Sequence, residues 1–224
     1  MSIERCRHNG VRTGLLLLLL VGSAPAWAGV RTGVELGVNT ASLSYDDDSG
    51  FPFIYWDRHW RSSFTGGVTL EVPLQDRFAL TTGLRYVQEG NRVELDMRPD
   101  YNFTEKFCVV QHYLSLPVRA TWRPSPSRRF FAALGPEVAL LLSGRIVVEA
   151  VSPPNGARGA DVTDDLNRVL LAMDAEAGTE FPFGGHTGVL TVRYAHGLTA
   201  AAKKDHWVSG WKTRGVECLL GARW

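Results

Sequence analysis

The chain has 224 residues, of which 45% are hydrophobic and 21% charged, and its 24 Lys and Arg nearly balance its 23 Asp and Glu. This balance gives no electrostatic argument for a nucleic-acid partner, which would favour a strongly basic chain. Outside the first 28 residues no stretch has the ~20 apolar residues that a membrane-spanning helix needs, so a membrane location would require strands.

The first 28 residues have the organisation of an export signal. Three arginines within residues 5–12 are followed by the apolar run Leu15–Val21, which is too short to span a membrane, and by a small-residue cleavage pattern over 26–28. We therefore predict a cleaved signal peptide over 1–28 and one outer-membrane β-barrel domain over 29–224.

Eight segments of the mature chain alternate apolar and polar residues with a period of two, which is typical of strands with one apolar face. They cover residues 33–39, 64–72, 78–89, 111–122, 130–142, 171–181, 190–197 and 216–224. The third segment is the clearest. Asp161–Ala172, before the sixth, has a possible helix cap at Asp161 or Thr163. We predict a loop leading into a strand there, because an even number of strands has to close.

The connections between these segments alternate in length. The short ones are Leu74–Asp76, Arg123–Arg128 and Pro182–His186, and the long ones are Leu43–Ser62, Gly90–Lys106, Gly144–Asn167 and Thr199–Lys212. With all long loops at one end, the segments form an up-and-down meander. Such a meander is typical of a bacterial outer-membrane barrel with short periplasmic turns. The predicted fold is all-β, an eight-stranded antiparallel transmembrane barrel.

The alternation also predicts which face meets lipid. Charged residues of both signs recur in mid-strand on the polar parity, where lipid contact would cost ~2–4 kcal/mol for an arginine at the bilayer midplane, so we expect them inside the barrel. They are Glu35, Glu71, Arg85, Arg119, Glu137, Asp174, Glu176, Arg193, Glu217 and Arg223. An eight-stranded interior is only wide enough for side chains, so these residues favour a closed barrel over a channel.

Aromatic residues gather at the strand ends on the apolar parity, as expected for two girdles at the two membrane interfaces. Phe78, Trp122, Phe130, Phe181 and Trp224 lie at the short-turn end, and Phe64, Tyr86 and Tyr194 lie near the long-loop end. The chain also ends on an apolar-parity aromatic, Trp224. We expect outer-membrane lipid and, through this last strand, the barrel-assembly machinery as partners.

Several strand motifs, in order, resemble one known family. They are Gly33–Asn39, Glu71–Leu74 with Phe78–Leu80, Tyr113–Val118, Ala133–Pro136 and Arg193–Thr199. Together they are similar to the PorT-like outer-membrane β-barrel family. The resemblance implies an eight-stranded barrel and no particular activity. His196 stands where the family more usually has an aromatic residue.

No residue cluster predicts catalysis, a cofactor or a metal. His196 lies on the apolar parity near the outer end of its strand, which leaves open a lipid A-modifying enzyme. However, Ser209 and Asp205 lie in the next loop rather than in a nucleophile–base spacing. Asp46–Asp48 could hold calcium but lack the longer EF-hand pattern. A solvated acidic loop is the favoured reading.

The predicted function is therefore structural or surface interaction through the outer loops, without catalysis. Alternatives are the lipid A-modifying enzyme and a narrow passive channel. Aromatics in the first and last loops could contact an extracellular partner, pack on one another or enter the headgroup layer. They are Phe51, Phe53, Tyr55, Trp56, Trp60, Trp207 and Trp211, and the apolar Ile54 lies among those of the first loop. Cys108 and Cys218 could form a disulfide in an oxidising compartment, but they lie on opposite sides of the predicted ring.

Overall fold

The computed structural model of the protein describes residues 29–44, 55–96, 104–125, 129–152, 159–203 and 212–224. Their elements are β1 (Arg31–Ser44), β2 (Tyr55–Gln75), β3 (Phe78–Asp96), β4 (Thr104–Trp122), β5 (Phe130–Ser152), β6 (Ala160–Asp161), the 3₁₀ turn η2 (Thr163–Asp165), β7 (Val169–Phe183), β8 (His186–Gly197) and β9 (Lys212–Arg223). Within these ranges no helix is long and apolar enough to cross a membrane.

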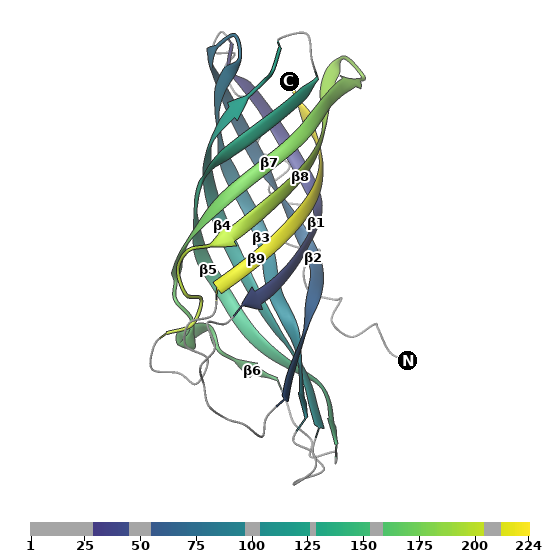
Figure 1. Cartoon of the computed structure of the whole chain (residues 1–224), viewed down its shortest axis with the longest axis vertical. Helices are drawn as coiled ribbons and strands as arrows, with labels where there is room; N and C mark the ends of the chain where they lie inside the picture. Colours follow the sequence, from purple (N-terminus) through teal and green to yellow (C-terminus); the bar gives the residue numbers. More distant parts are fainter. Residues whose placement is uncertain (1–28, 45–54, 97–103, 126–128, 153–158, 204–211) are drawn as a thin grey trace.

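Eight of these strands close into a ring of antiparallel neighbours. The order around the ring is β1, β2, β3, β4, β5, β7, β8 and β9, and β9 pairs back onto β1 from Gly33–Arg223 to Ser44–Lys212. The two-residue strand β6 pairs only with Arg145 and Ile146 of β5, outside the ring. The closed, tilted barrel in Figure 1 confirms the predicted fold class.

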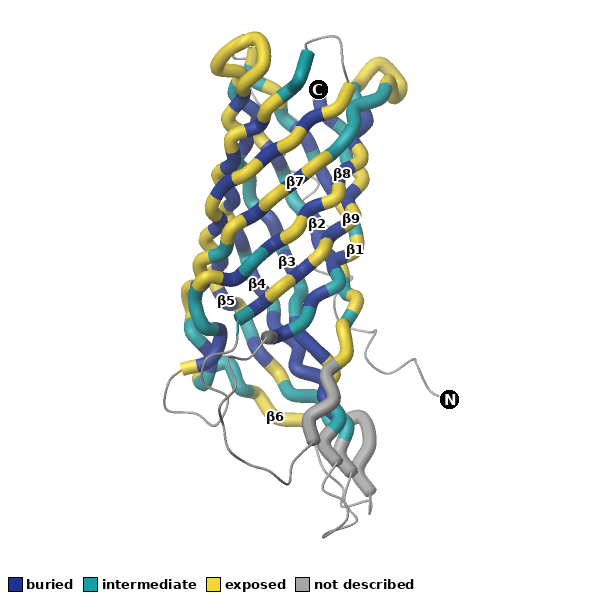
Figure 2. Tube along the Cα trace, in the orientation of Figure 1, coloured by how far each residue is buried: buried dark blue, intermediate teal, exposed yellow. Residues whose placement is uncertain are grey.

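Exposed and buried residues alternate along every strand of the ring, as Figure 2 shows. All ten charged residues predicted to lie inside are buried, and the apolar parity is outside, with Val118 and Val192 38% and 52% exposed. A soluble barrel would have the opposite arrangement. The exposed apolar band therefore has to be covered by lipid.

The two predicted short turns that the structure describes in full, β2–β3 and β7–β8, lie at the end of the barrel where the C-terminus is found, and β4 ends and β5 begins at the same end (Figure 1). In the last of them, Gly184 and Gly185 connect Phe183 to His186 with φ of +53° and +85°. Two positive φ angles are the requirement of the two-residue hairpin turn that matches strand twist, and glycine meets it without steric cost. Phe183, 58% exposed, adds to the girdle at this end, and the predicted Phe181, partly exposed on the same parity, lies against Gly188 of β8.

The predicted long loops were wrong in their bounds, because strands occupy much of three of them. Strands β2 to β5 have 21, 19, 19 and 23 residues, whereas β1, β7, β8 and β9 have 14, 15, 12 and 12. A membrane crossing needs only about 9–11 residues. The four long strands therefore continue past the membrane as a paired sheet at the end opposite the short turns (Figure 1). We call this sheet the outer extension.

The ambiguous segment Asp161–Ala172 is a loop leading into a strand, as predicted, but with more structure than expected. It contains the end of β6 and the single 3₁₀ turn η2, and β7 then begins at Val169. Cys108 is buried, Cys218 is exposed, and no disulfide joins them. The predicted signal peptide lies outside the described residues and stays a prediction.

Candidate functional site

The barrel interior is the most chemically distinctive part of the described structure, and Arg193 of β8 lies at its centre. The Arg193 guanidinium is 0% exposed. It donates to Glu35 Oε1, Glu176 Oε2 and Glu217 Oε2, each at 2.9 Å. These acceptors come from β1, β7 and β9, so a single side chain connects four strands across the lumen. We call the layer around it the central ion layer.

Two further arginines complete the central ion layer from the opposite wall. Arg119 of β4 donates to Glu176 and lies 3.8 Å from Asp174 Oδ2. Arg85 of β3 lies 3.2 Å from both Glu217 and Glu137. The layer therefore contains three guanidinium groups and five carboxyl groups, all buried.

A second ion layer lies toward the short turns. Arg123 donates to Glu71 at 2.8 Å and to Glu180 at 2.9 Å. Arg223 reaches the same two carboxylates at 3.1 Å each, and Arg31 lies 3.7 Å from Glu71. With Arg31, this turn-end ion layer has three cations and two carboxylates. The two layers together hold six arginines and seven acids. Arg31 is half exposed and Arg123 and Glu180 are partly buried, and the near balance of opposite charges lets the other ten be buried.

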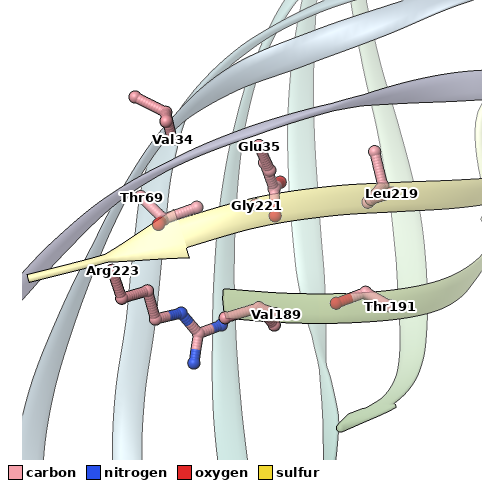
Figure 3. A pocket seen from close by; sticks show the side chains of 8 residues that line it. All are labelled: Val34, Glu35, Thr69, Val189, Thr191, Leu219, Gly221 and Arg223. Atoms are coloured by element: carbon pink, nitrogen blue, oxygen red, sulfur yellow. The ribbon is translucent and has the colours of Figure 1, made fainter. Parts of the chain in front are cut away.

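The space between the two layers is small. A cavity of about 10 Å³ is lined by residues of β1, β2, β8 and β9, with Glu35 of the central ion layer and Arg223 of the turn-end ion layer among them (Figure 3). This is room for about one water molecule. At both levels side chains joined by ion pairs occupy the described lumen.

The outer mouth of the barrel is covered by an apolar cluster, which we call the lid. Leu166, Ala201 and Ala202, from the segments before β7 and after β8, pack on Tyr113, Ala139, Leu141 and Leu170 of the barrel wall. The two segments are held together by the Leu166–Ala202 bridge and by Asn167, whose side chain donates to the carbonyls of Ala200 and Ala202. The described structure is thus closed at three levels.

The candidate catalytic residue His196 is not part of a catalytic arrangement among the described residues. It lies on the outer face of β8, with its Nδ1 3.3 Å from the Tyr194 hydroxyl and with Met173 and Arg214 as cross-strand neighbours. A nucleophile would need a base within hydrogen-bond reach and a third group to orient that base. Ser209, Asp205 and the acidic run Asp46–Asp48 lie outside the described residues, as do most of the predicted loop aromatics.

Sequence reasoning identified the lumen charges but missed Arg123, which was assigned to a turn. Arg123 directly follows the last residue of β4, and its side chain turns back into the lumen to meet Glu71 and Glu180. Parity would have indicated this, because Arg123 continues the inward series of Arg119 and Thr121. Trp60, 54% exposed, is the one predicted loop aromatic whose side chain is described.

Comparison with known proteins gives a family match over most of the chain. The model of the outer membrane protein beta-barrel domain matches residues 23–202. No curated protein sequence matches the chain. The family match places the chain in the bacterial outer membrane, whereas the narrower PorT-like resemblance stays a prediction.

Several solved structures are similar at low identity. The attachment invasion locus protein Ail of Yersinia pestis is 10% identical, with 87% of this chain and 98% of that chain covered and a TM-score of 0.41. OprG from Pseudomonas aeruginosa is 12% identical, with coverage of 87% and 95% and a TM-score of 0.46. The Neisserial surface protein NspA is 12% identical, with coverage of 86% and 95% and a TM-score of 0.41. We transfer no role from similarities of this size. On the family match, this chain belongs to the outer membrane protein beta-barrel domain family.

Proposed function

We propose that the protein is a non-enzymatic surface-interaction protein, in which a closed barrel anchors the outer extension of β2–β5 above the membrane. The main support is the unequal strand length: the four long strands stay paired from the membrane to Asp96, Thr104 and Ser152. Paired strands have far fewer conformations than a loop, so a partner would meet a preorganised surface.

The apolar interior of the extension supports the same proposal. Leu43, Val93, Phe107 and Val109 are buried together, with Ile146 and Val148 packed against them. The lumen therefore changes from ionic in the middle to apolar at the outer end. Such a core stabilises a sheet outside the membrane, and neither a channel nor a lipid-facing active site requires one.

Surface labelling tests the placement of the extension. In a Cys218→Ala background, Trp60→Cys at the extension is expected to react with a membrane-impermeant maleimide on intact cells. Asp76→Cys, in the β2–β3 turn, is the matched control and should react only after permeabilisation. Photo-crosslinking from Trp60→Cys and from Lys106→Cys should then yield the same adduct, absent from the control. Labelling of the control on intact cells, or no shared adduct from the two positions, would contradict the proposal.

Two assays test the rival functions. Planar-bilayer recording of the purified protein should show no discrete conductance steps, because both ion layers and the lid close the lumen. Mass spectrometry of lipid A from cells with wild-type protein and with His196→Ala should give the same acylation and phosphorylation pattern. Conductance steps would favour the channel, and a pattern that changes with His196 would favour the enzyme.

A further inference from the structure

The outward faces of β3, β4 and β5 carry Tyr86, His112 and Arg145 at the level of the outer aromatic residues and just beyond it, and Arg61 lies beside them at the register shift of β2 between Trp60 and Thr65. Arg61, Tyr86, His112 and Arg145 lie on four successive strands of the ring. The Tyr86 hydroxyl is 2.5 Å from His112 Nδ1, and their rings are 5.9 Å apart. Arg61 is within Coulombic reach of both Tyr86 and His112, and Arg145 of His112. We call these four residues the basic rim.

Register places the basic rim at a defined depth. Tyr86 pairs with Leu114, and His112 lies two residues further out, whereas Trp122 at the other girdle is ten residues from His112. At ~3.4 Å per residue and a tilt of ~40°, ten residues rise about 26 Å along the barrel axis. The apolar band of such barrels is about 25 Å tall. His112 therefore lies at the level of the outer lipid headgroups.

The basic rim offers mainly donors. A guanidinium presents five N–H donors in a fork that matches phosphate. When Tyr86 donates to Nδ1 of His112, the ring proton is on Nε2, which is then a further donor. Arg61 Nη1 is buried and donates to no described group. Of the nearby acids, Asp161 is within Coulombic reach of Arg145, and Glu94 is 2.7 Å from Lys106. Among the described residues, Arg61 and His112 therefore have no acidic partner.

We propose that Arg61, His112 and Arg145 bind a phosphate group on the headgroup of an outer-leaflet glycolipid. The acyl chains of such a lipid would lie along the exposed apolar band immediately below, on Leu116 and Val118 of β4. One molecule would thus meet the charges and the apolar surface in the order in which the strand presents them. This site does not depend on the proposed surface-interaction function.

Native mass spectrometry of the detergent-solubilised mature protein tests this site with three probes: diphosphorylated lipid A, the same lipid without phosphates, and phosphatidylcholine. Wild-type protein should bind the diphosphorylated lipid about tenfold more tightly than either other lipid, as expected for one or two charge-assisted hydrogen bonds. Arg61→Gln and Arg145→Gln should each reduce this preference severalfold. Arg145→Lys, which keeps the charge, should retain part of it.

Arg214→Gln is the matched control, because Arg214 is also an exposed outward-facing arginine at the outer end, on β9 beside His196. It should leave the preference within about twofold of wild type. An equal loss in Arg214→Gln and Arg145→Gln would show general attraction to a basic surface and would overturn the site. No phosphate preference in wild type, or a preference unchanged in both β2 and β5 variants, would also overturn it. Heat-modifiable gel migration confirms that each variant is folded.

Discussion

Replacement of Arg193 by methionine is the most direct perturbation of the central ion layer. The substitution keeps much of the apolar length of the side chain but removes the guanidinium that Glu35, Glu176 and Glu217 share. Glu176 would still have Arg119, and Glu217 would still have Arg85. Glu35 is only 7% exposed, and it would lose its only ion pair among the described residues.

One uncompensated buried charge sets the expected magnitude. Removing one partner of a buried ion pair destabilises a protein by about 3–5 kcal/mol, chiefly because the other charge is left without compensation. We therefore expect Arg193→Met to lower the free energy of unfolding by about that amount. Denaturant unfolding in lipid vesicles, followed by tryptophan fluorescence and by gel migration, measures this difference.

A double variant separates the charge effect from packing. Glu35→Gln combined with Arg193→Met removes the uncompensated charge, so it should be at least ~1 kcal/mol more stable than Arg193→Met alone. Arg168→Met is the control, because Arg168 and Asp164 are 73% and 93% exposed and their pair should contribute less than ~1 kcal/mol. If Arg193→Met unfolds within ~1 kcal/mol of wild type, the structural role of the central ion layer is refuted.

Three further outcomes are expected. Gly90→Ala should destabilise the protein by at least ~1–3 kcal/mol in denaturant unfolding, because Gly90 has φ of +137° and a Cβ would lie 1.9 Å from the Val109 carbonyl oxygen. Gly184→Asn, with open space around it, should be tolerated. Equal losses of stability in the two variants would contradict this reasoning. Leu166→Ala should weaken the lid by ~2–5 kcal/mol. The readout is faster hydrogen exchange of the Asn167 N–H that donates to Ala201, with the backbone amides of the barrel strands unchanged. Unchanged exchange at Asn167 would count against the lid. Hydrogen bonds from the Thr163 side chain and backbone lower the pKa of Asp161, so the stability they give is present above the unfolded value of ~3.9 and is lost as the pH falls through the folded value. An NMR titration should show the lowered midpoint. If Thr163→Ala, which keeps the backbone N–H, leaves that midpoint unmoved, the contribution of the Thr163 side chain is disproved.

The membrane-spanning part of the fold could be predicted because every strand there has one face toward lipid and the other toward the closed lumen. Lipid requires apolar residues outside, and the closed lumen accepts charges inside, so a period of two specifies both the strand and its orientation. Val118 and Val192, which are 38% and 52% exposed, lie on the lipid face as this pattern requires. The same pattern placed all ten lumen charges correctly.

The outer extension could not be predicted from that pattern, because its outward face meets water. Around Gly90–Glu94 the outward residues are no longer apolar, so the alternation that marks a transmembrane strand stops although the backbone pairing continues. The pairing of the ions could not be predicted either, because Arg193 and Glu35 are 158 residues apart in sequence and meet only when β8 and β1 face one lumen. The lid likewise depends on Leu166 and Ala202, which come from two different connections.

Spin labels on three strand positions test the central claim that lipid covers the apolar face of the barrel wall and that the barrel encloses the ions. In a Cys218→Ala background, labels at Val118 and Val192 should relax faster with dissolved oxygen and be shielded from a water-soluble nickel chelate. A label at Thr191, which is 2% exposed and faces the lumen next to Val192, should be shielded from oxygen. Contact of the chelate with Val118 and Val192, together with oxygen access at Thr191, would contradict the orientation of the whole barrel.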